Sequence, residues 1–324
     1  MYKRQYQLSI VIPVFNSEQY LPRLFKSLGE VPPEVEIILV NNGSTDNSAR
    51  LLQHYHETHA DTVIIDENRR GVAFARNAGL DNSNGRYVWF IDADDVLLPG
   101  AVNRILRVIK GTGFDLLVFD YLSLVEKDKV PKEAPAVKKA EKTKLADILH
   151  EMLTGAHDPI GGFPHNKVFA RKLIGTERFE NLQYAEDLAF FLPILLRANN
   201  IYRLHDALYV YYQHAGSIAH KINTEKLTDY AKVVDEVERV LRSSDVAANK
   251  DVDEYILRRR LSIYFQNIAA SNDLGLKRHI RDKMAQYSFK KLMLYKKDKK
   301  LVIKMLLYKF RVLDIFPFLL KYVY

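Results

Sequence analysis

The stretch YVWFIDADD (87–95) decides the fold of this chain, because an apolar run passes without a turn into three carboxylates. Residues 87–91 have the apolar and aromatic composition of a buried strand. A buried parallel strand carries the residues that follow its C-terminal end to the crevice in which open α/β sheets bind ligands. The stretch therefore predicts an α/β sheet with clustered carboxylates at its ligand-binding edge.

The three carboxylates are Asp92, Asp94 and Asp95. Grouped carboxylates repel one another unless a cation joins them, and both Mg²⁺ and Mn²⁺ take oxygen ligands. Mg²⁺ in particular is usually held by one or two carboxylates together with phosphates of the substrate. The pattern predicts a Mg²⁺ or Mn²⁺ site without choosing between the two ions. The alternative is an Asp-rich turn that only caps the next helix, and Asp95 fits that role as well.

Length and composition indicate a globular protein with one large domain or two ordinary ones. The 324 residues are 48% hydrophobic and include no cysteine, which excludes a disulfide framework and a thiolate metal site. Lys3 and Arg4 precede the apolar residues 8–15, but this run contains Pro13 and no small-residue cleavage site follows it. We expect a first strand there, not a signal peptide. No segment approaches the roughly 18 apolar residues of a membrane span.

Strand-like and helix-like segments alternate over the first 120 residues. Apolar runs occupy residues 8–14, 35–41, 62–66, 86–92 and 114–120, and amphipathic segments begin near Ser17, Thr45, Gly71 and Pro99, with Ser44 or Thr45 as a possible cap. This alternation predicts parallel βαβ units with right-handed crossovers. Residues 125–144 are charged and contain two prolines, which predicts a loop or mobile insert. From about residue 225 onward the pattern predicts helices.

Polar loops follow the other predicted strands, at residues 11–20, 41–48 and 71–80. Because the C-terminal ends of parallel strands meet at one edge, these loops converge on the crevice of the acidic turn. Phe15 can stack on a base, and Asn42 can hydrogen-bond to the edge of a base. Arg76 offers charge-assisted hydrogen bonds to phosphate or carboxylate.

Five segments together resemble the family 2 glycosyltransferases of the GT-A fold. They are SIVIPVFN (9–16), VNNGSTDNS (40–48), GVAFARNAGL (71–80), FIDADD (90–95) and YAEDLAFF (184–191), in the family's order and approximate spacing. The resemblance covers about residues 8–220 and implies a Rossmann-like, mostly parallel sheet flanked by helices. We expect a GT-A catalytic domain at 1–222, with a nucleotide-sugar half at about 1–120 and an acceptor half at about 145–222. A helical, basic region at 223–324 would follow it.

The resemblance also implies the donor site. It places Pro13, Phe15, Glu18 and Asn42 around the base, Arg76 and Ala93 with the rest of the nucleotide, Asp92 near the ribose or the metal, and Asp94 on the metal. The family often has Asp-Asp where this chain has Asn41-Asn42, but an Asn amide oxygen can still accept from uracil N3–H. A UDP-sugar is therefore the expected donor. Mn²⁺ or Mg²⁺ would bridge its diphosphate and stabilise the charge of the leaving group.

The pair Glu186-Asp187 opens an amphipathic helix, where early acidic residues also favour a helix N-terminus through the dipole. In the resembling enzymes the Asp of this pair is the general base, so Asp187 would take the proton of the acceptor hydroxyl in an inverting displacement. Glu186 would orient Asp187 or contact the acceptor. Further candidates are His165, Asn166 and Lys167 on the acceptor side, which the resemblance of residues 161–174 to the family suggests. His214 could bind metal or diphosphate and Ser217 could bind phosphate, and the alternative for these two is a polar surface residue.

Basic residues gather at the C-terminal end. Residues 281–324 hold twelve Lys or Arg against three Asp, a net charge of +9, whereas the whole chain carries +8. KKLMLYKKDKK (290–300) contains six lysines, and residues 301–324 are apolar and aromatic with sparse cations. We expect 281–324 to dock on an anionic membrane surface as an interfacial helix. The alternatives are a terminal helix packed on the catalytic domain and nucleic-acid binding, which no motif accompanies.

These observations together predict a cytoplasmic, inverting, metal-dependent glycosyltransferase at the inner face of the plasma membrane. It would add a hexose or N-acetylhexosamine to a glycan or lipid-linked oligosaccharide in capsule, O-antigen or exopolysaccharide synthesis, with no nucleic-acid partner. A sugar-nucleotide pyrophosphorylase is disfavoured, because PVFNSEQY (13–20) stands where such enzymes have a glycine-rich loop. An inactive membrane scaffold is disfavoured as well, because it would not need Asp92, Asp94 and Asp187.

Overall fold

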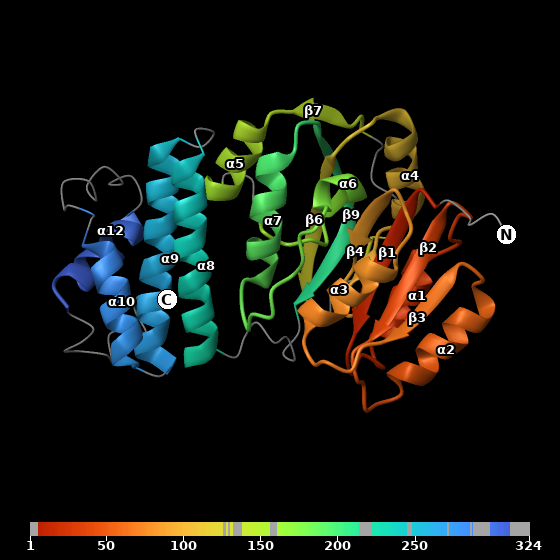
Figure 1. Ribbon diagram of the computed structural model, residues 1–324, viewed down its shortest axis with the longest axis horizontal. Helices are drawn as coiled ribbons and strands as arrows, with labels where there is room; N and C mark the ends of the chain where they lie inside the picture. Colours follow the sequence, from red (N-terminus) through yellow and green to blue (C-terminus); the bar gives the residue numbers. More distant parts are fainter. Residues whose placement is uncertain are drawn as a thin grey trace. The chain divides into compact units, whose positions relative to one another are not determined.

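The computed structural model describes residues 6–125, 128, 130–131, 138–155, 161–213, 222–244, 248–270, 272–285, 287 and 299–311 (Figure 1). It divides into two compact units. The first comprises Met1–Ile148, His157–Asn181 and Glu186–Ser217, and the second comprises Leu149–Ala156, Leu182–Ala185 and Ile218–Tyr324. Domains at 1–222 and 223–324 remain a proposal beside this division.

The first unit is built on a mixed sheet, and the predicted α/β fold class is confirmed. One half of the sheet has the spatial order β3 (Thr62–Asp66), β2 (Val35–Asn41), β1 (Leu8–Val14) and β4 (Tyr87–Phe90), and every pairing in it is parallel. All seven residues of β1 are buried, as are six of the seven in β2. Continuous apolar runs are typical of strands covered on both faces, so the sequence predicts these strands well.

The other half of the sheet is more irregular than the sequence predicts. β8 (Lys167–Ala170) lies between β4 and β6 (Leu116–Val125), antiparallel to both. β9 (Ile201–Gln213) pairs parallel with β6, while β5 (Val96–Leu97) and β7 (Glu141–Thr143) pair antiparallel with β9. The run of neighbouring parallel strands therefore stops at β4. β7 also lies in the segment predicted as a loop, because its mostly exposed side chains give no apolar pattern.

Helices flank this sheet (Figure 1): α1 (Leu21–Leu28), α2 (Ser48–Thr58), α3 (Val72–Asn82), α4 (Ala101–Gly111), α6 (Arg171–Ile174) and α7 (Glu186–Arg197), with α5 (Leu145–Thr154) shared between the units. Packing of α3 on β1 and β2 is close. A Cβ at Gly79 would lie 2.3 Å from Val11 Cγ1 and 3.1 Å from Val40 Cγ2. Only a glycine therefore lets α3 approach the sheet this closely.

The helices predicted to start near Ser17 and Thr45 begin a few residues later, because these residues join two loops to each other. The Ser17 N–H donates to Ser48 Oγ at 2.8 Å, and the Thr45 N–H donates to Asn16 Oδ1 at 2.8 Å. α1 begins only at Leu21 and α2 only at Ser48. The loops that follow β1 and β2 are thus tied together beside the C-terminal ends of both strands.

The second unit is helical, as the sequence predicts. It contains α8 (Thr224–Ser243), α9 (Asn249–Ala270), α10 (Leu274–Met284) and α12 (Lys299–Lys309), and α9 contacts each of the other three. Arg260 of α9 is 0% exposed and pairs with Asp235 at 2.7 Å and Glu238 at 2.6 Å, both on α8. Pairing with two carboxylates offsets the desolvation of this guanidinium, which would otherwise be strongly unfavourable.

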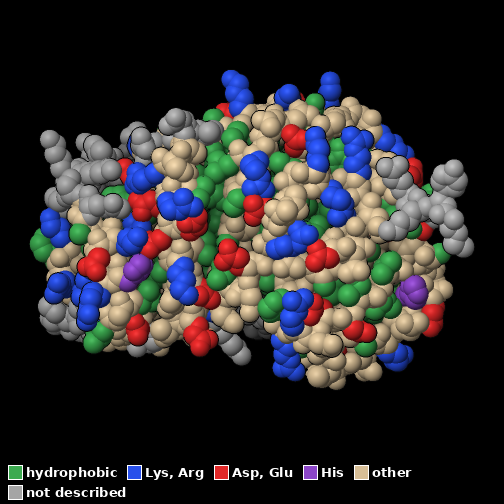
Figure 2. All heavy atoms as spheres, viewed as in Figure 1, with side chains coloured by type: hydrophobic (Ala, Val, Ile, Leu, Met, Phe, Trp, Pro, Cys, Tyr) green, Lys and Arg blue, Asp and Glu red, His purple; other side chains and the backbone are tan. Residues whose placement is uncertain are grey.

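Much of the basic tail, residues 288–298 and 312–324, lies outside the described residues. Within α12 and its C-terminal end, Ile303 is 53% exposed and Phe310 is 65% exposed, whereas Leu301 and Met305 are buried. On the face drawn in Figure 2, the basic side chains are interspersed with acidic ones. Over the part of the chain that the structure describes, no helix combines the length and apolarity needed to cross a membrane.

Candidate active site

The acidic turn follows β4 directly, and Asp95 anchors it to β9. Asp95 is 0% exposed; Tyr209 Oη donates to its Oδ2 at 2.5 Å, and the Tyr212 N–H donates to its Oδ1 at 2.8 Å. Tyr209 Oη also accepts from the Asp92 N–H at 3.2 Å. Burial raises the pKa of the Asp95 carboxyl well above its ordinary value, and the neighbouring Asp94 and Asp92 act in the same direction. Asp95 is therefore an anchor within the fold, and its interpretation as a simple helix cap is wrong.

Arg76 of α3 joins the acidic turn to the start of α7. Its guanidinium is almost wholly buried and donates to Asp92 Oδ1 at 2.9 Å, Asp187 Oδ1 at 2.6 Å and Glu186 Oε1 at 3.2 Å. It also lies over the ring of Phe179, 5.2 Å from the centroid. Burial alone would lower the pKa of Arg76, but the three carboxylates outweigh it and raise that pKa. The sequence predicts either phosphate or carboxylate as the partner of Arg76, and in the structure its partners are carboxylates.

Asp187 lies in the first turn of α7, and its side chain keeps 21% exposure. Burial raises the pKa of its carboxyl well above the ordinary value, and the ion pair with Arg76 acts in the opposite direction. A carboxylate with a raised pKa holds a proton more readily, which is what a general base near neutral pH requires. The adjacent Glu186 shares the Arg76 contact, as expected of a residue that helps to orient Asp187.

His165 lies against the acidic turn, and its predicted role on the acceptor side stays a prediction. Its ring is stacked with Tyr209 at a centroid distance of 4.6 Å and with Phe163 at 5.4 Å. The side chain is 4% exposed, and burial lowers the pKa of the imidazole to about 3, so the ring is neutral. Nε2 is buried without a hydrogen-bond partner.

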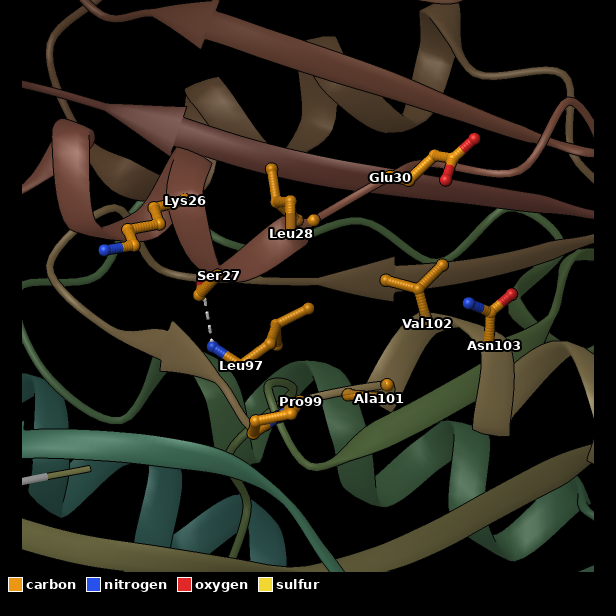
Figure 3. A pocket seen from close by; sticks show the side chains of 11 residues that line it. Lys26, Ser27, Leu28, Glu30, Leu97, Pro99, Ala101, Val102 and Asn103 are labelled. Carbon is orange, nitrogen blue, oxygen red and sulfur yellow. Dashed lines mark hydrogen bonds between the residues drawn. The ribbon is translucent and has the colours of Figure 1, made fainter. Parts of the chain in front are cut away.

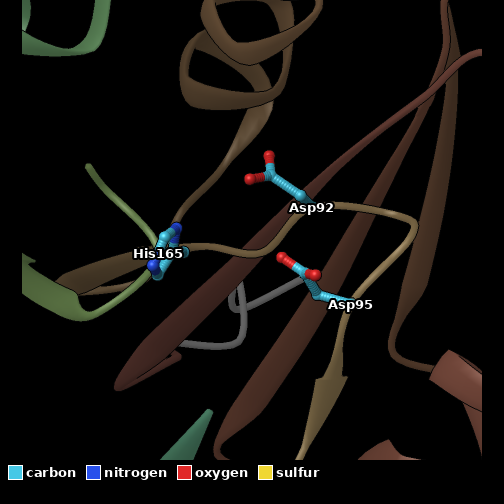
Figure 4. Close-up of side chains that lie close together, drawn as sticks. All are labelled: Asp92, Asp95 and His165. Carbon is cyan, nitrogen blue, oxygen red and sulfur yellow. The ribbon is translucent and has the colours of Figure 1, made fainter. Parts of the chain in front are cut away.

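One ligand atom each from Asp92, Asp95 and His165 lies within 4.8 Å of the other two (Figure 4). Two carboxylates and a neutral imidazole are suitable donors for a divalent cation, and the unpaired Nε2 is a polar atom that still needs a partner. The residues present therefore fit a cation. The predicted pair was Asp92 with Asp94, and the structure groups Asp92 with Asp95 and His165 instead.

Three residues predicted around the base lie on or after β1. Pro13 lies within β1 and is buried. Phe15 is 44% exposed, and the guanidinium of Arg70 lies over its ring, 5.9 Å from the centroid. Glu18 is exposed, and its Oε2 accepts from the Asn47 N–H at 2.8 Å, which braces the loop before α2.

Both ends of the Asn42 side-chain amide form hydrogen bonds within the protein, and its predicted contact with the base stays a prediction. Its Nδ2 donates to the carbonyl oxygens of Glu67 at 3.0 Å and Arg69 at 2.7 Å, and its Oδ1 accepts from the Gly71 N–H at 2.9 Å. The residue is only 5% exposed, and these three hydrogen bonds engage both the oxygen and the nitrogen of its amide. Asn42 fixes the loop that leads into α3 and so helps to position Arg76.

Lys167 is 0% exposed, and its predicted role on the acceptor side stays a prediction. Its Nζ donates to the carbonyl oxygens of Gly161 at 2.8 Å and Phe163 at 2.6 Å, and to Asn166 Oδ1 at 2.7 Å. Burial lowers the pKa of this ammonium well below its ordinary value. Lys167 therefore holds the loop that carries Phe163 and His165.

Sequence reasoning missed Arg23 of α1, whose guanidinium donates to the backbone oxygen of Asp94. The guanidinium lies over Tyr212, 4.1 Å from the ring centroid, and over Tyr20 at 5.0 Å. An arginine on an amphipathic helix gives no signal that separates such a contact from a solvated surface position. Ala93, also predicted at the nucleotide, is 6% exposed, and the predicted His214 and Ser217 lie outside the described residues.

A cavity of about 330 Å³ lies between the end of α1 and the start of α4 (Figure 3). Ser27 Oγ accepts from the Leu97 N–H at 3.0 Å in its wall. No carboxylate of the acidic turn lines this cavity, so it is separate from the candidate active site.

Comparisons with known proteins agree with this geometry. The family model for glycosyl transferase family 2 matches residues 9–164. The chain is 26% identical over 274 residues to glycosyltransferase GlyA of Streptococcus pneumoniae, covering 82% of this chain and 38% of that protein. It is 27% identical over 262 residues to glycosyltransferase GlyG of the same organism, covering 78% and 84%. The crystal structure of S. aureus TarS 1–349 in complex with UDP-GlcNAc is similar in fold, with a TM-score of 0.67, 20% identity, and coverage of 86% of this chain and 80% of that one.

Proposed function

We propose that this chain, which belongs to the family 2 glycosyltransferases, transfers a sugar from a UDP-sugar to a hydroxyl of a glycan or lipid-linked oligosaccharide. The transferred sugar is a hexose or an N-acetylhexosamine, and the anomeric configuration is inverted. The observation that carries this proposal is the position of Arg76, which pairs with Asp92 and Asp187 together. A single buried guanidinium thereby holds the donor side and the catalytic base at a fixed separation.

Asp187 acts as the general base in this reaction. The acceptor hydroxyl oxygen attacks the anomeric carbon, the bond from that carbon to the diphosphate oxygen breaks, and the hydroxyl proton passes to the Asp187 carboxylate. One displacement of this kind gives a β-glycoside from an α-linked donor. General-base assistance contributes about 10²- to 10⁴-fold to the rate. Arg76 keeps the Asp187 carboxylate oriented by donating a hydrogen bond to it. Glu186 helps to hold Arg76 in this position, because it accepts a hydrogen bond from the same guanidinium nitrogen.

Phe15 is the residue that we assign to stacking on the base, because its side chain is exposed. TarS was solved with UDP-GlcNAc, which makes UDP-sugars the donors to test first. Asp92 and Asp94 of the acidic turn would hold Mn²⁺ or Mg²⁺ against the diphosphate. A cation bound there supplies Lewis-acid stabilisation of the negative charge that develops on the leaving group.

Nucleotide binding is the first test of this function. UDP, GDP, CMP and dTDP would be titrated calorimetrically into the protein with and without Mn²⁺, and transfer from radiolabelled UDP-sugars would be followed in parallel. We expect metal-dependent binding of UDP by both wild type and Asp187→Asn, with transfer reduced about 10²- to 10⁴-fold in the variant. Glu57→Gln, on the exposed face of α2, is the matched control and should retain full transfer. Failure of every nucleotide to bind the folded protein would refute the function.

The pathway and location belong to the same proposal. We place the enzyme at the cytoplasmic face of a bacterial plasma membrane, where it extends capsule, O-antigen or exopolysaccharide glycans and docks through residues 281–324. Six lysines in 290–300 supply the charge, and the exposed Ile303 and Phe310 supply apolar contacts. Replacing the six lysines by glutamine in the full chain should abolish flotation with phosphatidylglycerol vesicles. Undiminished binding, or equal binding to phosphatidylcholine vesicles, would exclude electrostatic docking.

A further inference from the structure

Phe163 is an exposed aromatic ring in the loop that leads into β8. Its side chain is 43% exposed, whereas residues 164–167, which follow it, are all buried. The ring is stacked with the imidazole of His165, at a centroid distance of 5.4 Å and 13° between the ring planes. A single exposed apolar side chain is common on protein surfaces, so the surroundings of this ring decide whether it has a use.

The loop that carries Phe163 is held firmly. Lys167 Nζ donates to the carbonyl oxygens of Phe163 at 2.6 Å and Gly161 at 2.8 Å, and Pro164 fixes the backbone directly after the ring. A Cβ at Gly161 would lie 2.3 Å from Phe163 Cε2, so a side chain at position 161 would push the ring aside. A ligand that stacks on a ring held in place loses less free energy to ordering than one that stacks on a mobile ring.

The same loop lies against the helix that carries the proposed base. A Cβ at Gly162 would lie 2.8 Å from Leu188 Cα and 3.1 Å from Leu188 N, so the backbone just before Phe163 contacts the first turn of α7. Asp187 is the residue before Leu188 in that turn. Burial raises the pKa of the Asp187 carboxyl, and the Lys167 ammonium, which holds the Phe163 loop, is among the charges that act against it. The exposed ring of Phe163 therefore lies beside the approach to Asp187.

The residues around Phe163 suit a sugar ring. The less polar face of a pyranose carries C–H groups, and the electron-rich face of an aromatic ring attracts these weakly positive hydrogens. Tyr121 and Tyr211 are partly exposed and contact the same His165 imidazole, at centroid distances of 5.1 Å and 6.0 Å. Aromatic rings with a few hydroxyls are typical of sites for small polar ligands, whereas an acyl chain would need a continuous aliphatic surface.

We infer that Phe163 stacks against a pyranose ring of the acceptor, so that the enzyme selects a sugar-terminated acceptor over an acyclic polyol. The assignment of this sugar to the acceptor rests on the proposed function, because Asp187 is the proposed base for the acceptor hydroxyl. Phe15, which we assign to the nucleotide base, lies on the separate loop after β1. Phe163 is thus a specificity-determining residue on the acceptor side of the site.

Fluorine NMR of the full chain with 4-fluorophenylalanine at position 163 tests the contact directly. The methyl pyranosides of glucose, galactose, mannose and N-acetylglucosamine would be titrated with and without UDP and Mn²⁺, with sorbitol as the acyclic control. We expect a saturable shift of the resonance with one or more of the pyranosides and no shift with sorbitol. The same label at position 15 should respond to UDP and not to that pyranoside.

Steady-state transfer to the pyranoside that binds gives the second readout. Phe163→Ala should raise the acceptor KM about 3- to 10-fold, the loss expected for one aromatic contact, and leave the KM of the UDP-sugar unchanged. Phe163→Tyr keeps the ring and should retain the wild-type acceptor KM. Val63→Ala is the matched control, because Val63 is 41% exposed on β3 of the same unit, and it should change neither KM.

Absence of a shift with every pyranoside, or an equal shift with sorbitol, overturns the inference. A rise in the donor KM in place of the acceptor KM assigns the ring to the donor sugar and overturns it as well. The fluorine measurement retains the ring, so it decides the matter even if Phe163→Ala does not fold. UDP titration separates this inference from the function: UDP binding without a pyranoside shift refutes the stacking alone, and a pyranoside shift without nucleotide binding refutes the transferase function alone.

Discussion

Replacing Arg76 by methionine should destabilise the first unit by about 3 kcal/mol. The guanidinium is 5% exposed and faces three carboxylates at 2.6, 2.9 and 3.2 Å. Removing one partner of a buried ion pair costs about 3–5 kcal/mol, because an uncompensated charge is left behind. The three carboxylates keep between 16% and 27% exposure, so water replaces part of the lost interaction. The lower end of the range therefore applies.

Urea unfolding followed by tryptophan fluorescence measures this effect in the right part of the protein. Trp89 is the single tryptophan of the chain and lies on β4 in the first unit, 0% exposed. Its emission therefore reports the unfolding of that unit, even if the second unit unfolds separately. Arg178→Met is the matched control: its pair with Asp81 is 2.8 Å long but 40% and 54% exposed, so it should cost less than about 1 kcal/mol.

Activity against pH gives a second readout of the same substitution. Arg76 favours the ionised form of Asp187, so its removal raises the pKa of that carboxyl further. Since the ionised Asp187 carboxylate is the proposed base, the acid limb of kcat/KM should move to higher pH in Arg76→Met and less so in Arg76→Lys. A free energy of unfolding within about 0.5 kcal/mol of wild type, together with an unmoved acid limb, would refute the electrostatic role of Arg76.

Three further substitutions test packing, acid stability and the anchor of the acidic turn. Gly79→Ala should destabilise the first unit by about 1–3 kcal/mol, because its Cβ would meet Val11 Cγ1 at 2.3 Å; Gly111→Ala, which meets nothing within 4 Å, should leave the urea midpoint unchanged or slightly raised. Burial would raise the pKa of Glu238, but its arginine partners outweigh burial and lower that pKa. The ionised Glu238 therefore stabilises the fold above the ordinary pKa of a glutamate, and this contribution is lost as the pH falls below that value. Glu238→Gln should remove part of this loss when helix content is followed by circular dichroism from pH 7 to pH 2. Tyr209→Phe should cost about 1–3 kcal/mol in the same urea assay by leaving Asp95 without its hydroxyl partner, and an unchanged midpoint would contradict the anchoring role.

The parallel half of the sheet could be predicted from the sequence because its strands are buried on both faces. The runs at 8–14, 35–41 and 62–66 coincide with β1, β2 and β3. β8 was not predictable by the same signal, since it is four residues long and begins with a lysine. Its position between β4 and β6 depends on long-range pairing, which local periodicity does not encode.

Residue types at the site were predictable, but their partners were not. Asp92 could be chosen because it follows a buried strand at the ligand-binding edge of the sheet, Arg76 because it lies in a loop predicted to reach the same edge, and Asp187 because of the family resemblance. Asn42 and Lys167 have equally polar side chains, but both donate hydrogen bonds to backbone oxygens of neighbouring loops. The sequence gives the donors and acceptors of a side chain, and only the fold determines whether protein or ligand satisfies them.

The charge balance of the site explains why its parts depend on one another. Arg76 faces Asp92, Glu186 and Asp187, so one cation is surrounded by three carboxylates, and the buried Asp95 adds a fourth within the same turn. A donor diphosphate entering this crevice would bring further negative charge and would be repelled by the unbalanced carboxylates. A divalent cation bound at Asp92, as proposed above, would offset that repulsion. Because Asp92 and Asp187 share Arg76, a cation bound at Asp92 would also change the electrostatic environment of Asp187, the proposed base.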